Sequence, residues 1–245
     1  MLNVEYTISG GVLILALDTT TRGGSVAVTH DGQVLSLIIG DQSRTHGERL
    51  PAEIAHALDA AGMTRRQIDL LAVAAGPGGF TGLRIGLAVM QGLAMTLDKP
   101  VVGVSTLDAL AAQAVNSDAE LIVPWMDAQR GDVFATVIDR ETGLAIVPPV
   151  AASPAAVLDE WHARLAPHRV VFIGDAVARD RALIERLGEG RWQLRTPEAL
   201  APQIAMLGNR MAAQGLAGLP HALTPIYVRR PDAEIEKERR AADAN

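Results

Sequence analysis

Residues 12–39 read VLILALDTTTRGGSVAVTHDGQVLSLII, and this stretch decides the fold. The apolar run at 12–17 predicts a buried strand. Alternating residues at 25–29, a turn at 30–32 and a further apolar run at 33–39 predict two more strands joined by a tight hairpin. The chain is therefore expected to open as an antiparallel meander of three strands.

Helices and strands alternate after this meander, and the whole order then restarts. In the first half, apolar spacing predicts helices at 48–61, 81–97 and 105–115 and strands at 68–75 and 101–104. In the second half it predicts strands at 121–126, 133–139, 144–147, 169–173 and 192–195 and helices at 154–165, 178–187 and 197–214. Both halves begin as a meander and continue with helices and strands. This order indicates an α/β fold, duplicated into two actin-like (ribonuclease H-like) domains with mixed sheets flanked by helices.

The same order divides the chain into three parts. We expect a first domain over residues 1–116, a degenerate second domain over 117–228 and a charged tail over 229–245. The helix at 197–214 is assigned to the second domain, and packing back on the first domain is the alternative.

Composition excludes several classes of function. The 245 residues contain no cysteine, which removes disulfides, thiolate metal sites and a cysteine nucleophile. A net charge of −6 and 3% aromatic residues disfavour independent binding to nucleic acid. The run at 12–17 is too short for a membrane span or a signal segment, so we expect a cytoplasmic protein without membrane contact.

The glycine-rich stretch GPGGFTGLRIG, at 76–86, follows a predicted strand and opens a predicted helix. Bare amides at a helix N-terminus bind anions, so Gly76, Gly78, Gly79 and Thr81 are candidates for a phosphate cradle. A tight turn whose glycines permit close packing is the alternative. The spacing fits neither a Walker loop nor the dinucleotide fingerprint.

The other positions that bind phosphate in actin-like kinases depart from the kinase pattern in this chain. Asp18, Thr19 and Thr20 follow the first strand, where actin-like kinases carry an aspartate and a close-approach glycine. The counterpart at 127–132 reads DAQRGD, with one glycine in place of two. These residues leave two hypotheses, a vestigial nucleotide site and a nucleotide site shared with a partner, and they disfavour an ATP-dependent sugar kinase. The histidines show no metal-ligand spacing, so no metal site is predicted.

Six motifs occur in one order along the chain: ILALDT at 14–19, TH and LP at 45–51, the glycine-rich stretch, GVSTL at 103–107, DAQRGDVF at 127–134 and PIYVR at 225–229. Together they resemble the bacterial TsaB (YeaZ) family of tRNA threonylcarbamoyladenosine biosynthesis proteins, over about residues 12–230. The glycine-rich stretch with Arg84 is the most specific of them.

This resemblance implies a non-catalytic subunit with the actin-like fold. Family members form a heterodimer with the related catalytic subunit TsaD, are joined by the ATPase TsaE, and form homodimers through the same surface when alone. The complex makes N6-threonylcarbamoyladenosine beside the tRNA anticodon, so tRNA is reached only through it. TsaD holds a metal through two histidines whose counterparts here are Thr106 and Leu110, which disfavours a metallopeptidase. No tightly bound cofactor is expected, and ATP or ADP at a site shared with partners stays open.

The resemblance and the residue pattern agree on one surface of the first domain. The helix at 81–97 is apolar nearly all round, which indicates burial on more than one side by this chain's core or by a second protein. Gly82 and Gly86 lie one turn apart and leave a groove that another helix could enter. With the helix at 48–61, this predicts a partner surface made of Leu50, Ile54, Leu58, Gly82, Arg84, Ile85, Gly86, Val89, Met90 and Leu93.

Overall fold

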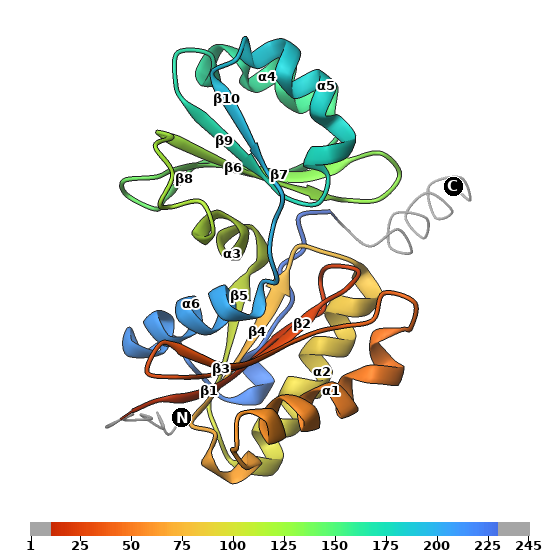
Figure 1. The fold of residues 1–245 in the computed structure, drawn as a ribbon, viewed down its shortest axis with the longest axis vertical. Coiled ribbons are helices and arrows are strands. Elements are labelled where there is room, and N and C mark those ends of the chain that lie inside the picture. Colours follow the sequence, from red (N-terminus) through yellow and green to blue (C-terminus); the bar gives the residue numbers. More distant parts are fainter. Residues whose placement is uncertain (1–10, 230–245) are drawn as a thin grey trace, which may run out of the picture.

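A computed structural model describes residues 11–229. It contains two five-stranded sheets with their helices, one above the other in Figure 1. Each sheet is mixed, with an antiparallel meander on one side and parallel strands on the other. The predicted two-domain α/β fold is confirmed. The predicted tail at 229–245 lies outside the described residues, apart from Arg229.

The first sheet contains the opening meander. Its strands are β1 (Leu13–Asp18), β2 (Ser25–His30), β3 (Gln33–Ile39), β4 (Leu70–Gly76) and β5 (Val101–Ser105), in the order β3-β2-β1-β4-β5. β1 pairs antiparallel with β2 and parallel with β4. Its alternate residues enter two different cores, because helices cover both faces of the sheet. This double burial explains why β1 reads as an unbroken apolar run.

Three helices cover these two faces. α1 (His46–Ala60) and α2 (Phe80–Leu97) share one core with the sheet, and α6 (Ala201–Ala213) packs on the opposite face against β1, β2 and β4. Two short helical turns, η1 (Arg65–Gln67) and η2 (Pro220–Ala222), lie in the connections. α6 therefore follows the second sheet in sequence but lies on the first (Figure 1).

The second sheet repeats the plan. It contains β6 (Leu121–Asp127), β7 (Val133–Asp139), β8 (Ala145–Ala152), β9 (Val170–Ile173) and β10 (Trp192–Arg195), in the order β10-β9-β6-β7-β8. α4 (Pro154–Leu165) and α5 (Val177–Gly188) form a core with one face around Trp125, Trp161 and Trp192. On the other face, α3 (Thr106–Ala112) contacts β6 and β7. α3 thus joins the two domains through one continuous core.

Three predicted elements differ from the structure by three residues or more at one end. The strand predicted at 144–147 continues to Ala152 through Pro148 and Pro149, because an edge strand tolerates prolines that lack an N–H group. The helix predicted at 105–115 ends at Ala112, after Ser105 caps its start. The helix predicted at 197–214 begins only at Ala201.

Among the described residues, α2 is the one helix with the length and hydropathy of a membrane span. Its Leu83, Leu87 and Met90 are buried in the core that it shares with β4 and α1. A helix that packs in the core of a domain can thus match a membrane span in length and hydropathy.

Candidate functional site

The turn after β1 is held by hydrogen bonds between its own residues. Asp18 is buried, and its carboxylate accepts hydrogen bonds from the backbone N–H of Thr20 (2.7 Å) and from the hydroxyls of Thr20 (2.6 Å) and Thr21 (2.6 Å). The hydroxyl of Thr106 lies 3.4 Å from that of Thr20. Asp18 therefore uses both carboxylate oxygens to fix its own turn, and the turn residues Thr19 and Thr20 are buried as well.

The glycines of the 76–86 stretch pack directly against this turn. A side chain at Gly78 would overlap Thr20, and the backbone N–H of Gly79 donates to the carbonyl of Thr20 at 3.1 Å. Side chains at Gly82 and Gly86 would overlap the carbonyl and the hydroxyl of Thr19. The predicted docking groove at Gly82 and Gly86 is therefore wrong. The turn of the same chain fills it, and close packing is what these glycines permit.

A buried arginine on α1 ties the helix to the same turn, and the sequence did not reveal it. Arg49 is 3% exposed; it donates to both carboxylate oxygens of Glu53 (2.6 and 2.8 Å), to the carbonyl of Gly23 and to Nδ1 of His46 (2.7 Å). The other ring nitrogen of His46 lies 3.2 Å from the carbonyl of Thr21. Burial, followed by the Arg49 charge, lowers the pKa of His46 below its ordinary value.

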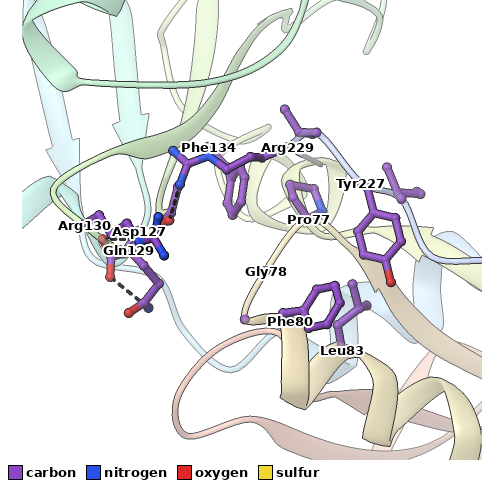
Figure 2. A pocket seen from close by; sticks show the side chains of 14 residues that line it. Pro77, Gly78, Phe80, Leu83, Asp127, Gln129, Arg130, Phe134, Tyr227 and Arg229 are labelled. Atoms are coloured by element: carbon purple, nitrogen blue, oxygen red, sulfur yellow. Dashed lines mark hydrogen bonds between the residues drawn. The ribbon is translucent and has the colours of Figure 1, made fainter. Parts of the chain in front are cut away.

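A cavity of about 320 Å³ lies between the two domains (Figure 2). The first turn of α2 forms one wall and the loop after β6 forms another, while a C-terminal segment completes it. The lining residues are Pro77, Gly78, Gly79, Phe80, Leu83, Asp127, Ala128, Gln129, Arg130, Phe134, Ile226, Tyr227, Val228 and Arg229. Sequence reasoning noted the apolar segment at 226–228 and the motif around it, but assigned it no place in a site.

Aromatic and arginine side chains surround this cavity. Phe80 and Tyr227 stack with ring centroids 5.7 Å apart. The Arg84 guanidinium lies 3.9 Å from the centre of the Phe80 ring and donates to the Tyr227 hydroxyl at 3.1 Å. Arg229 pairs with Asp132 across the domain boundary. The lining therefore suits a planar, largely apolar group, with Asp127, Arg130 and Arg229 as the charged residues on the cavity wall.

The cavity wall includes two of the predicted nucleotide residues but not all of them. Gly78 and Gly79 line it, whereas Asp18, Thr19 and Thr20 are buried behind Gly78. Gly76 is buried against the carbonyl of Ile226, and Thr81 is exposed in the first turn of α2.

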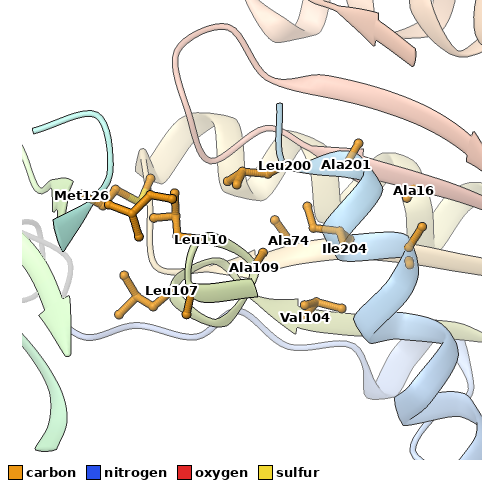
Figure 3. Close-up of a cluster of buried hydrophobic side chains, with 14 of the residues drawn as sticks. Ala16, Ala74, Val104, Leu107, Ala109, Leu110, Met126, Leu200, Ala201 and Ile204 are labelled. Carbon is orange, nitrogen blue, oxygen red and sulfur yellow. The ribbon is translucent and has the colours of Figure 1, made fainter. Parts of the chain in front are cut away.

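The positions that match metal-binding histidines are buried in the shared core. Thr106 is completely buried. Leu110 is 1% exposed and belongs to the hydrophobic cluster drawn in Figure 3. Within residues 11–229, no group of three or more His, Asp or Glu side chains is arranged to hold a metal ion.

The predicted partner residues divide into two sets. Leu50, Ile54, Leu58 and Met90 are buried in the core of the first domain, so their assignment to a partner surface is wrong. The periodicity was correctly helical but could not tell which face the sheet covers. Arg84 is exposed, and Ile85, Val89 and Leu93 are partly exposed.

Sequence reasoning missed two residues of this outer face. Ala88 is exposed, and Met95 exposes 74% of its surface. The outer face of α2 therefore presents small and apolar side chains over several turns, of the kind that helix–helix contacts between proteins use.

Comparison with known proteins gives consistent results. A family model for TsaD, tRNA N6-adenosine threonylcarbamoyltransferase, matches residues 34–237. The tRNA threonylcarbamoyladenosine biosynthesis protein TsaB of Bacillus subtilis is 29% identical over 228 residues, which cover 91% of this chain and 96% of the relative.

Two solved structures extend the comparison. A Pseudomonas aeruginosa protein with similarity to the peptidase YeaZ is 29% identical, with a TM-score of 0.73 over 89% of this chain and 100% of its own. The activator of 2-hydroxyisocaproyl-CoA dehydratase from Clostridium difficile, solved with bound ADPNP, shares the fold alone. It is 12% identical, with a TM-score of 0.51 over 83% of this chain and 97% of its own.

The motifs, the two-domain fold and these relatives agree. The chain belongs to the family that the TsaD model describes, and within it to the TsaB (YeaZ) proteins with an actin-like fold.

Proposed function

We propose that the chain is a non-catalytic subunit in the biosynthesis of N6-threonylcarbamoyladenosine in tRNA. The main support comes from the turn after β1, because residues of this turn fill the space beside the glycines at the start of α2. Asp18 is satisfied by its own turn, and Thr19 and Thr20 occupy the space beside Gly78, Gly82 and Gly86. A kinase of this fold needs an open glycine-lined turn for phosphate. The relatives named TsaB support the pathway.

The outer face of α2 is the proposed surface for TsaD. Ile85, Val89 and Leu93 are anchored in the core of the first domain on one side and partly exposed on the other. Ala88 and Met95 extend this face. Small side chains let a partner helix approach closely, and the exposed methionine adds apolar area that adapts to its shape.

The other proposed contacts of the complex depend on the same surface of α2. In the cytoplasm, TsaD would displace a second copy of this chain from α2, TsaE would join the heterodimer, and tRNA would be bound by the complex and not by this acidic chain alone.

A second candidate function concerns the interdomain cavity. Phe80 and Tyr227 could stack on a base, and Arg130 and Arg229 lie on the same cavity. The first turn of α2 adds backbone N–H groups, because Gly79 at its start has no capping side chain. ATP or ADP held between this chain and a partner is the ligand that these features favour.

Light scattering during size-exclusion chromatography tests the proposed partner. This chain mixed with TsaD from its own organism should elute as a heteromeric peak. Ala88→Glu and Met95→Glu place a charge on the outer face of α2 and should each weaken the complex about tenfold or more.

The matched control is Ile146→Glu, which adds the same charge at an exposed position of β8, in the other domain. The control should bind TsaD as the unmodified chain does. Equal binding by all three variants, or no heteromeric peak for the unmodified chain, would refute the assignment.

A further inference from the structure

The first sheet ends in an edge strand, β3, whose apolar side chains are exposed on one face. The strand reads QVLSLII and contains no charged residue and no proline, which are the residues that normally protect an edge strand. Val34, Leu37 and Ile39 have 49%, 40% and 68% of their surface exposed. An edge of this kind is a template for one more strand.

The pairing of β3 with β2 places the most exposed side chain on the α6 side of the sheet. Leu37 lies opposite Ala27, which belongs to the core that α6 covers. Ile39 lies opposite Ser25, whose hydroxyl accepts a hydrogen bond from the backbone N–H of Ala201 at the start of α6. Leu37 and Ile39 therefore share one face, beyond the strands on which α6 packs.

The other sheet edges are protected. β8 carries Pro148 and Pro149 in its centre, and β10 is a short strand that ends at Arg195. The edge strand β5 is bonded at Val101 to Gly218 of a later segment. β3 has a bulge near its start, which leaves its second half regular. That second half is the open edge.

The segment before the described residues carries the sequence pattern of a half-buried strand. Residues 1–9 read MLNVEYTIS. From position 2 onward, apolar residues at 2, 4, 6 and 8 alternate with polar residues at 3, 5, 7 and 9. Two glycines follow at positions 10 and 11, and glycine permits a sharp bend of the backbone. The alternation suits a strand with one apolar and one polar face.

The described chain begins beside the tip of the β2–β3 hairpin. The backbone N–H of Val12 donates to the Asp31 carboxylate at 3.0 Å, and a Cβ at Gly11 would overlap the side chains of Asp31 and His30. β1 and β3 both run away from this tip, because each pairs antiparallel with β2. A segment that reaches the tip along the open side of β3 therefore runs antiparallel to β3.

We propose that residues 2–6 pair antiparallel with β3 and cover its open edge. The path from β1 across the hairpin tip to the far side of β3 crosses three strand spacings, about 14 Å, which about four or five extended residues span. Residues 7–11 supply this crossing and leave residues 2–6 beside β3. The resulting arrangement of four strands is a Greek key.

The alternation fixes which side chains meet. Directly opposite residues of antiparallel strands point to the same face of a sheet. Val4 opposite Leu37 and Leu2 opposite Ile39 thus form two apolar pairs on the α6 side. The polar residues of the segment lie on the other side, with Ser36, whose hydroxyl donates to a carbonyl of α1. This surface is separate from the outer face of α2, and the proposal does not rest on the function proposed above.

Cysteine cross-linking tests the pairing directly, because the chain contains no cysteine of its own. Opposite Cα atoms of antiparallel strands are about 4.5–5.5 Å apart, within the range that a disulfide spans. Under mild oxidation, Val4→Cys with Leu37→Cys should form an intramolecular disulfide at least about tenfold faster than either of two control pairs.

The controls change the face or the domain. Asn3→Cys with Leu37→Cys places the first thiol on the opposite face of the proposed strand. Val4→Cys with Ile146→Cys places the second thiol at an exposed position of β8, in the other domain. Equal rates in the three pairs, or no disulfide in the first pair, overturn the proposal. Disulfide-linked dimers in place of the intramolecular product also overturn it, because the edge would then belong to a second copy.

Hydrogen exchange gives an independent measurement on a chain without cysteine. Val4→Asp places a charge in the proposed apolar row and should speed exchange of the amides at 36–39 about tenfold or more. Asn3→Asp adds the same charge on the polar face and should leave those amides unchanged, and neither variant should affect the amides of β5. Exchange of β3 that is equal in Val4→Asp and the unmodified chain overturns the proposal.

Discussion

Gly86 has no side chain, and the hydroxyl of Thr19 lies in the space that this leaves. Alanine at this position would collide with that hydroxyl, on a turn that Asp18 holds rigid. We predict that Gly86→Ala lowers the free energy of unfolding by about 1–3 kcal/mol, the usual cost of overpacking a core. Urea denaturation followed by circular dichroism measures it.

Gly92 provides the matched control on the same helix. Nothing lies within 4 Å of a Cβ placed there. Gly92→Ala should stabilise the protein by about 0.5–1 kcal/mol, because alanine has the better helix propensity. If the two variants were equally stable, Thr19 would not be packed against α2 as described.

His46 gives a residue-scale prediction for pH. Its folded pKa is lowered by burial and by Arg49, so the unfolded chain binds a proton more readily than the folded chain. The stability that this contributes is present above the unfolded pKa of about 6.5 and is lost as pH falls through the folded pKa. His46→Gln should therefore show a smaller loss of stability between neutral and mildly acidic pH.

The exposed histidine on the same helix is the control. His56→Gln should retain the pH dependence of the unmodified chain, measured by denaturation at a series of pH values. An unchanged profile in His46→Gln would show that His46 does not carry the effect.

At the scale of elements, α6 is the segment whose place differs most from its position in the sequence. Ile204 on α6 is fully buried in the core over β1 and β4. Ile204→Ala should cost about 2–5 kcal/mol of unfolding free energy. Met206→Ala, at a more exposed position on the same helix, should cost under about 1 kcal/mol. Denaturation midpoints compare the two, and equal costs would contradict the packing of α6 on the first sheet.

The sequence predicted elements better than it predicted their contacts. β3, β7, α4 and β10 begin and end where the pattern placed them, because strand and helix periods and caps are local properties. The filling of Gly82 and Gly86 by Thr19 could not be predicted, since a glycine marks a close approach without naming what approaches. The cavity also escaped prediction, because it combines residues near 77, 130 and 227.

At the scale of the whole molecule, two domains share one core through α3 but enclose a cavity on one side. The ion pair of Arg229 with Asp132 and the contact of Ile226 with β4 connect the C-terminal segment to both domains. Arg229→Ala should loosen this connection and speed hydrogen exchange in the loop at 127–132. Arg181→Ala removes an exposed α5 arginine that pairs with Glu185 of its own helix, and it should leave that loop unchanged. Unchanged exchange in both variants would show that Arg229 does not hold this loop in place.

The central claim is that this chain supports the reaction without performing it. The most direct measurement is the formation of N6-threonylcarbamoyladenosine on tRNA by TsaD and TsaE with the threonylcarbamoyl donor, in the presence and absence of this chain. We predict product with the unmodified chain, much less with Ala88→Glu, and none with this chain alone. Equal product without the chain, or turnover by the chain in the absence of TsaD, would contradict the claim.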